Sequence, residues 1–155
     1  MPVIERTVVL VKPDGVQRGM IGEIIHRFER KGLQLIGLKM MSFNDALLKE
    51  HYAHHTDKDW FSSFAGFMKS SPIIAMVWQG PQAIDVVRTL VGPTKGHEAA
   101  PGTIRGDFTI EASHNAIHAS DSTDTATAEI ERFFQTEELF EYTKTSNAHL
   151  YDPSR

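Results

Sequence analysis

The sequence predicts a single α+β domain, residues 1–155, in which strands alternate with amphipathic helices. The predicted order is strand, helix, strand, helix pair, strand, helix, loop, strand and helix. If the third strand pairs directly with the second, this order matches the ferredoxin-like βαββαβ motif, which has a four-stranded antiparallel sheet. The order alone also allows a doubly wound parallel sheet. A chain of 155 residues buries roughly 68–70% of the surface it exposes when unfolded, so a core can form without disulfides.

The first half of that order begins with a buried strand. Residues 7–12 are β-branched and apolar on both faces, which is typical of a central strand, and residues 13–15 supply turn chemistry after it. Residues 21–31 have apolar side chains at helical spacing, and Gly32 provides a stop. In residues 33–43 the side chains follow an alternating pattern, which predicts a second strand.

The middle of the chain predicts two helices, a strand and a further helix. Asn44 or Asp45 can cap the first helix, and clustered aromatic side chains predict the second over about 59–69. Residues 72–80 form an apolar run that predicts the third strand. Pro81 suits the first turn of the helix that follows.

The last third contains a long segment without periodicity. Residues 92–106 hold four glycines and two prolines, and loops longer than roughly 12–15 residues in compact domains are usually functional or disordered. Residues 115–120 predict a short strand, and residues 124–134 predict a final helix. The chain then continues as a tail over about 136–155.

Composition excludes several function classes. The chain has no cysteine, which excludes a disulfide framework, a thiolate zinc site, an iron–sulfur cluster and a cysteine nucleophile. A net charge of −4 argues against a basic surface for nucleic acid, so no specific nucleic-acid partner is predicted. No signal peptide is visible, and the apolar runs at 8–11 and 73–78 are far shorter than the roughly 20 residues that span a bilayer. We therefore expect a soluble, cytoplasmic protein without a membrane partner.

Cations in separate segments of the chain could converge on a polyphosphate. Arginine offers a bidentate fork and lysine a point charge to phosphate oxygens. The candidates are Lys12, Arg88, Thr94 and Arg105. By spacing alone, ordinary surface cations are the more common interpretation. Neither a Walker-type loop nor a Gly-x-Gly-x-x-Gly motif is present, which disfavours a P-loop or Rossmann mode of binding.

Histidine is unusually frequent, with eight in the chain. His51 and His55 are four residues apart, as are His114 and His118, a spacing that on a helix would suit a metal ion. Neither pair carries the glutamate of a His-Glu-x-x-His motif. We predict no metal site, and we expect His51 and His55 to lie outside the functional site. A metalloprotein that uses these four histidines remains an alternative.

The segment 115–121 is the most informative. A neutral histidine can act as a nucleophile when a partner on its other nitrogen fixes the tautomer. The small residues Ala119 and Ser120 would leave room for a phosphoryl group beside His118, and Glu129 on the next helix could orient the ring. The alternative for Glu129 is a solvated position on the helix surface.

Several motifs in this order and spacing resemble the nucleoside diphosphate kinase family. They extend from residue 5 to about residue 151, and the Lys-Pro-Asp-Gly start together with Asn-x-x-His-x-Ser-Asp is highly specific. The matching segments are Glu5–Thr7, Lys12–Gly19, Leu48–Tyr52, Ala75–Trp78, Pro101–Asp107 and Asn115–Asp121. The resemblance favours the ferredoxin-like fold and implies ping-pong transfer of a γ-phosphate from a nucleoside triphosphate to a nucleoside diphosphate.

The resemblance also implies roles for individual residues. His118 falls on the nucleophile, Glu129 orients it, and Ser120 belongs to its neighbourhood. Tyr52 lies beside the transferred group, and Asn115 contacts the sugar 3′-hydroxyl together with Lys12. The implied phosphate-binding residues are Lys12, Arg88, Thr94 and Arg105, and the implied base-stacking residues are Trp60 and Phe64. Core packing is the alternative for these two rings. Mg²⁺ is expected as a cofactor held mainly by the nucleotide phosphates.

The sequence departs from the family pattern at a few positions. Ala119 stands where glycine is usual, Gln79 replaces a frequent glutamate, and the 93–100 segment has Gly96 where proline is often seen. In the family this segment helps to hold subunits together, and we expect a homo-oligomer, with a hexamer favoured over a tetramer. A catalytically silent, kinase-like binding module is the second alternative, although the catalytic motif positions are filled.

Overall fold

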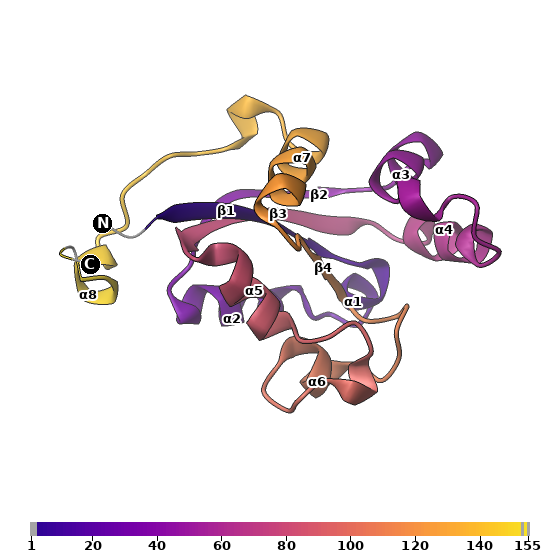
Figure 1. Cartoon of the computed structure of the whole chain (residues 1–155), viewed down its shortest axis with the longest axis horizontal. Coiled ribbons are helices and arrows are strands. Elements are labelled where there is room, and N and C mark those ends of the chain that lie inside the picture. The colour runs from indigo at the N-terminus through magenta and orange to yellow at the C-terminus, as the bar shows by residue number, and fades with distance from the viewer. Residues whose placement is uncertain (1–2, 153, 155) are drawn as a thin grey trace.

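One antiparallel sheet organises the molecule, with its four strands in the order β2-β3-β1-β4 (Figure 1). The computed structural model describes residues 3–152 and 154. The strands are β1 (Ile4–Val11), β2 (Gln34–Met41), β3 (Ile73–Pro81) and β4 (Ile117–Ala119). The third strand pairs antiparallel with the second, which confirms the ferredoxin-like order and excludes the parallel alternative.

Helices connect and cover these strands. The α-helices are α1 (Pro13–Gln17), α2 (Ile21–Lys31), α3 (Asp45–His51), α4 (Phe61–Lys69), α5 (Ala83–Val91), α6 (Ile104–Phe108), α7 (Thr123–Phe133) and α8 (Asn147–Leu150). Short 3-10 turns lie at Ala53–His55, Gly96–Glu98 and Thr136–Glu138. No helix among the described residues is long and apolar enough to cross a membrane.

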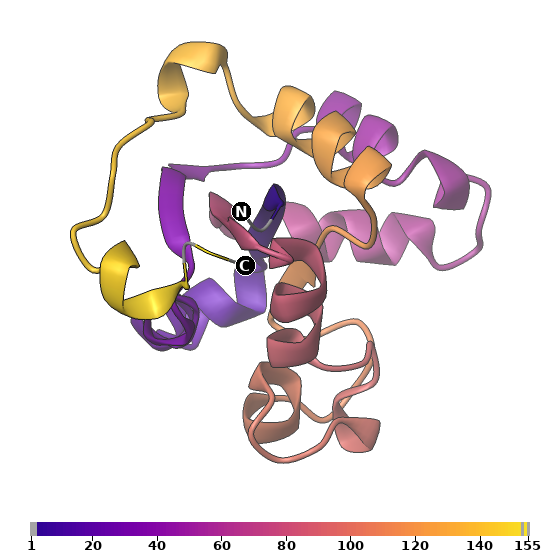
Figure 2. The same ribbon diagram turned by 60° about the vertical axis from the view of Figure 1, so that its left-hand side comes forward.

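The central strand β1 supplies both faces of the core. Val9 and Val11 pack on the face that α2 and α5 cover, whereas Val8 and Leu10 pack on the face of α3, α4 and α7. All four side chains are fully buried. This is the expected result of side chains that alternate along a strand with helices on both of its faces. Figures 1 and 2 show the two helical layers on opposite sides of the sheet.

Several helix boundaries follow the sequence signals. Gly32 ends α2 in the left-handed region with φ 108°, where glycine carries no steric penalty. The Asn44 side chain caps α3 by accepting a hydrogen bond from the Leu47 N–H at 2.8 Å. Helix α7 begins after Ser122 in the same manner.

The structure corrects three local predictions. Pro81 ends β3 rather than opening a helix, and α5 starts after Gln82, whose φ of 52° turns the chain. Residues 13–15, predicted as a turn, lie in the short helix α1. The aperiodic 92–106 segment is not entirely loop, because α6 begins at residue 104.

The C-terminal tail packs along the outer edge of β2. The Phe140 N–H donates to the Ile36 carbonyl at 2.9 Å, and the Tyr142 hydroxyl donates to the Leu35 carbonyl at 2.6 Å. Farther along, the Tyr151 hydroxyl donates to the Gly32 carbonyl at 2.6 Å. Two residues of the predicted tail, 153 and 155, lie outside the described residues.

Candidate active site

A cleft of about 1150 Å³ lies where the segments predicted to carry chemistry meet. Ten of the eleven predicted site residues line it: Lys12, Tyr52, Trp60, Phe64, Arg88, Thr94, Arg105, Asn115, His118 and Glu129. The eleventh, Ser120, is fully buried and hydrogen-bonded to Glu129. The fold thus brings together side chains from β1, the α3–α4 region, α5, the 92–106 segment, β4 and α7.

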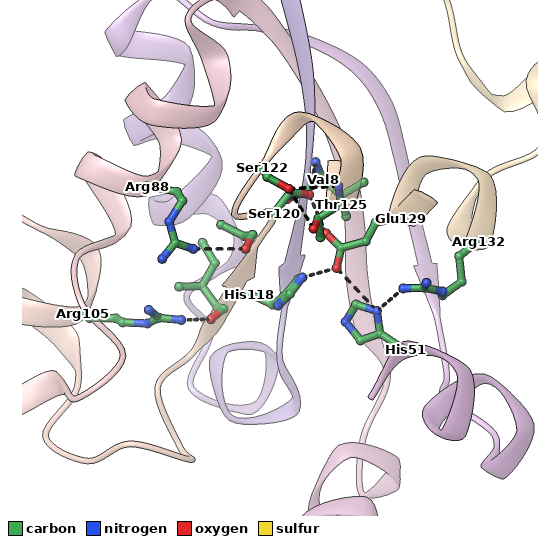
Figure 3. Close-up of polar contacts among 12 residues, drawn as sticks. Val8, His51, Arg88, Arg105, His118, Ser120, Ser122, Thr125, Glu129 and Arg132 are labelled. Carbon is green, nitrogen blue, oxygen red and sulfur yellow. Dashed lines mark hydrogen bonds and ion pairs between the residues drawn. The ribbon is translucent and has the colours of Figure 1, made fainter. Parts of the chain in front are cut away.

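His118 and Glu129 both line this cleft and contact each other (Figure 3). The Nε2 atom of His118 lies 2.6 Å from Oε2 of Glu129. The other carboxylate oxygen accepts a hydrogen bond from the Ser120 hydroxyl at 2.5 Å. Glu129 is only 2% exposed, which contradicts the solvated-surface alternative.

This contact determines the tautomer of His118. A carboxylate only accepts hydrogen bonds, so the ring proton lies on Nε2 and Nδ1 keeps its lone pair. Burial by itself would raise the pKa of Glu129, but the hydrogen bonds from His118 and from the Ser120 hydroxyl lower it below its ordinary value. The His118 side chain remains 23% exposed, so its ring can be reached from the cleft.

The turn before His118 is strained and tied to the end of β1. Ala116 is fully buried with φ 68°, and the Ile117 N–H donates to the Asn115 carbonyl across it at 2.8 Å. The Ala116 N–H donates to Oδ2 of Asp14 at 2.9 Å, and its carbonyl accepts from the Lys12 N–H at 2.9 Å. These bonds hold the segment before the histidine in one conformation.

Lys12 is buried beneath the cleft and points at the same turn. Its ammonium donates to Oδ1 of Asn115 at 2.8 Å, and the Asn115 amide donates to the Thr94 carbonyl at 2.9 Å. Burial, followed by the charge of Arg105, lowers the pKa of Lys12 to about 8. Its charge is therefore sensitive to pH and to any anion in the cleft.

The two arginines differ in their surroundings. Arg105 is 7% exposed and donates to the carbonyls of Ile117 at 2.6 Å and Gly92 at 3.1 Å. Burial and then the charge of Arg88 lower its pKa to about 10. Arg88 is exposed, and its Nη1 lies 3.4 Å from the Ala119 carbonyl. Arg105 therefore stabilises the loop as well as facing the cleft, whereas Arg88 makes one long hydrogen bond within the part of the chain that the structure describes.

Aromatic rings form another wall of the cleft. Phe64 meets Tyr52 edge to face at 4.8 Å between centroids and Trp60 at 5.6 Å. Trp60 is 48% exposed, so core packing does not account for its ring. The Tyr52 hydroxyl is buried with no hydrogen-bond partner among the described residues, and burial raises the pKa of this phenol.

The prediction that His51 and His55 lie outside the site is wrong, because both line the cleft, and His51 is the more deeply buried of the two. Its side chain is 1% exposed, and its ring meets that of His118 edge to face at 4.7 Å. Its Nδ1 lies 2.9 Å from Nη1 of Arg132 and 3.5 Å from Oε2 of Glu129. Sequence reasoning missed both His51 and Arg132, although the position of His51 beside Tyr52 was a usable signal.

The four histidines of the metalloprotein alternative do not gather at one place. His55 packs against Trp60, and the His114 ring lies 4.0 Å from that of Phe67. Ligand atoms of His51, His118 and Glu129 do lie within 4.8 Å of one another. However, the Arg132 cation already donates to Nδ1 of His51, and two imidazoles with one carboxylate are not the oxygen set that Mg²⁺ prefers.

The comparisons with known proteins agree with this geometry. The family model described as nucleoside diphosphate kinase matches residues 5–139. The chain belongs to the nucleoside diphosphate kinase family. It is 50% identical over 148 residues to a nucleoside diphosphate kinase of Bacillus cereus, covering 96% of this chain and 100% of the relative. The nucleoside diphosphate kinase of Archaeoglobus fulgidus is 48% identical over 149 residues, covering 96% of this chain and 99% of the relative.

A solved structure extends the similarity to the fold. The nucleoside diphosphate kinase of Halobacterium salinarum, in complex with CDP, has a TM-score of 0.93 at 47% identity, covering 97% of this chain and all of that one. The Aquifex aeolicus enzyme has a TM-score of 0.84 at 38% identity, covering 89% of this chain and 100% of that one. This kinase therefore transfers phosphoryl groups between nucleotides, and the family's general mechanism passes through a phosphohistidine.

Proposed function

We propose that His118 is the residue of this kinase that carries the phosphoryl group, with Nδ1 as the nucleophilic atom. The observation that carries the proposal is the 2.6 Å contact between Nε2 of His118 and Glu129, which leaves Nδ1 with its lone pair beside a cleft lined by cations. No hydrogen bond to Nδ1 of His118 is found among residues 3–152 and 154.

The first half-reaction forms one bond and breaks another. The Nδ1 lone pair attacks the γ-phosphorus in line, the N–P bond forms, and the bond from phosphorus to the β,γ-bridging oxygen breaks. The electron pair of that bond leaves with the nucleoside diphosphate. As the ring becomes positive, the Glu129 carboxylate stabilises it through the Nε2 proton, and Ser120 fixes the second carboxylate oxygen. The second half-reaction reverses these steps with a different diphosphate.

Cations from three segments would neutralise the moving charge. Phosphoryl transfer requires positioning and charge stabilisation more than covalent chemistry by the protein. Lys12, Arg88 and Arg105 are proposed to bind the phosphate groups, with Thr94 beside them. Mg²⁺ enters as part of the nucleotide substrate, held by phosphate oxygens. These three cations suit a ligand whose own oxygens carry the metal.

The nucleoside is proposed to occupy the other end of the cleft. Lys12 and Asn115, already hydrogen-bonded to each other, would bind the sugar 3′-hydroxyl, and Tyr52 would lie beside the transferred group. Trp60 and Phe64 would stack on the base, which tolerates every base because each has a π-face. The CDP complex of the Halobacterium salinarum relative supports a nucleoside diphosphate as ligand here.

The test is single-turnover labelling with a nucleoside triphosphate labelled at the γ-phosphate. The unsubstituted chain should become an acid-labile, alkali-stable phosphoprotein that passes its label to a different diphosphate. His118→Gln should abolish the labelling, whereas His26→Gln, the same change at an exposed position of α2, should not. Persistent label in His118→Gln would refute the assignment, and binding without transfer would favour the silent-module alternative.

Assembly and location form part of the same proposal. We propose a homo-oligomer, with a hexamer favoured over a tetramer. Apolar side chains exposed on the edge strand β2, where Leu38 is 51% and Met40 is 60% exposed, support self-association. Light scattering of the purified chain tests this, and a monomer would contradict it. A cytoplasmic location stays a prediction that cell fractionation tests.

A further inference from the structure

We propose that Arg132 is a positioning residue for phosphoryl transfer, because its guanidinium fixes the tautomer of His51 and so reserves Glu129 for His118. The inference rests on the proposed function of His118. It concerns side chains on the Glu129 side of the reactive ring, where Figure 3 shows Arg132, His51, Glu129 and His118 in one connected series.

The direction of the first hydrogen bond follows from chemistry. Nη1 of Arg132 lies 2.9 Å from Nδ1 of His51, and a guanidinium has donors but no acceptor. Nδ1 of His51 must therefore accept, which places the ring proton on Nε2. The arginine is itself held, with its side chain 17% exposed and its Nε 3.6 Å from Oε1 of Glu50.

The alternative tautomer would compete with His118. Oε2 of Glu129 lies 2.6 Å from Nε2 of His118 and 3.5 Å from Nδ1 of His51. A proton on Nδ1 of His51 would face the N–H groups of Arg132 on one side and offer the Glu129 oxygen a second donor on the other. With Arg132 in place this tautomer is excluded, and His118 is the hydrogen-bond donor to that oxygen among the described residues.

Packing fixes the His51 ring, so its proton is the remaining variable. The ring meets Tyr52 at 4.5 Å, His118 at 4.7 Å and Phe133 at 5.0 Å, each edge to face. Burial lowers the pKa of His51 to about 3, which keeps the ring neutral near pH 7. A neutral ring in a fixed place has two tautomers, and the neighbouring donor selects between them.

The catalytic consequence concerns the charge on Glu129. Its carboxylate stabilises the positive ring that forms as phosphorus bonds to Nδ1 of His118. A second donor on the same oxygen would withdraw part of that charge and weaken the stabilisation. Loss of Arg132 should therefore slow the chemical step while leaving nucleotide binding nearly unchanged.

The experiment combines a spectroscopic and a kinetic measurement on the full chain. Solid-state ¹⁵N spectra of protein labelled at histidine Nδ1 separate pyridine-type from pyrrole-type nitrogen, and His51→Gln identifies the His51 signal. The rate of His118 labelling and the nucleotide Kd are measured beside it. The variants are Arg132→Met, Arg132→Lys, which keeps a cationic donor, and Arg30→Met, the matched change at an exposed arginine of α2.

We expect a pyridine-type Nδ1 of His51 in the unsubstituted chain and a pyrrole-type signal in Arg132→Met. The labelling rate should fall about three- to tenfold in Arg132→Met with Kd within about twofold, because one hydrogen bond is weakened. The labelling rate of Arg132→Lys should lie between those of Arg132→Met and the unsubstituted chain. The labelling rate of Arg30→Met should match that of the unsubstituted chain.

Two results would overturn the inference. One is a pyrrole-type Nδ1 signal of His51 in the unsubstituted chain, a result that does not depend on how the Arg132 variants fold. The other is an Arg132→Met rate no lower than that of Arg30→Met. A chain that takes no label would instead contradict the proposed function, and the ¹⁵N spectrum separates that result from a failure of Arg132 to fix the tautomer.

Discussion

Replacing Glu129 with glutamine removes one charge from the proposed catalytic pair and preserves its shape. The carboxylate accepts from His118 at 2.6 Å and from Ser120 at 2.5 Å, and an amide can keep both contacts if Ser120 becomes the acceptor. A hydrogen bond to a charged group contributes roughly 1.5–3 kcal/mol, against about 1 kcal/mol for a neutral one. The loss of about 1–2 kcal/mol falls on the positive ring formed during transfer, which corresponds to a rate lower by roughly 5- to 30-fold.

The assay is rapid-quench labelling of the chain by a γ-labelled nucleoside triphosphate over a range of concentrations. We expect the maximal rate in Glu129→Gln to fall while the concentration for half-maximal rate stays within about twofold, because the carboxylate acts on the transition state. Glu131→Gln, an exposed neighbour on α7, serves as the matched control. A maximal rate within twofold of the unsubstituted chain, or a change confined to binding, would refute the reasoning.

Three further predictions concern the cations and the buried histidine. Arg105→Met should lower both the free energy of unfolding and the rate of phosphoryl transfer, because it removes the hydrogen bonds to the Ile117 and Gly92 carbonyls. Arg88→Met should chiefly weaken nucleotide binding. Equal losses of stability for the two variants in denaturant titrations would contradict this. Burial and the charge of Arg105 lower the pKa of Lys12 to about 8, and a bound triphosphate raises it, so binding should take up a proton and weaken as pH rises above 8. Calorimetry in buffers of different ionisation enthalpy should lose this proton uptake in Lys12→Met, and uptake that persists unchanged would exclude Lys12 as its source. Burial lowers the pKa of His51 to about 3, so between about pH 6.5 and pH 3 the unfolded chain binds a proton that the folded chain does not. The free energy of unfolding should therefore fall by up to about 1.4 kcal/mol for each unit by which the pH is lowered in this range. His51→Gln should flatten that slope between pH 6 and 5 at fixed protein concentration, and an unchanged slope would contradict the cause.

The regular elements were predictable because local chemistry specifies them. The apolar spacing over 21–31 and the left-handed glycine at 32 match α2, and the Asn44 cap appears as the sequence indicates. The antiparallel arrangement was not specified locally, since the order of elements allowed two sheets. The family resemblance selected the sheet that the β2–β3 pairing then confirmed.

Local patterns failed where the tertiary context decides the backbone. Pro81 reads as a helix start, but it closes β3 opposite Ile4, and the positive φ of Gln82 redirects the chain into α5. Within 92–106 no periodicity predicts α6, because a helix of five residues makes fewer than two turns. Its start depends on the Thr103 cap, whose side chain accepts from the Gly106 N–H at 2.9 Å.

The proposed histidine nucleophile and the proposed phosphate-binding cations were recognised through the family resemblance of their motifs, since spacing alone favoured ordinary surface positions for the cations. The sequence could not decide which side chains contact His118 and Glu129 on the side away from the cleft opening, and so position them. His51 and Arg132 are 81 residues apart, and a histidine on a polar segment reads as surface until α7 packs over α3. Burial, hydrogen-bond direction and tautomer arise only when distant segments meet. The sequence therefore determines the reactive groups, and the tertiary structure decides which charges and protons they hold.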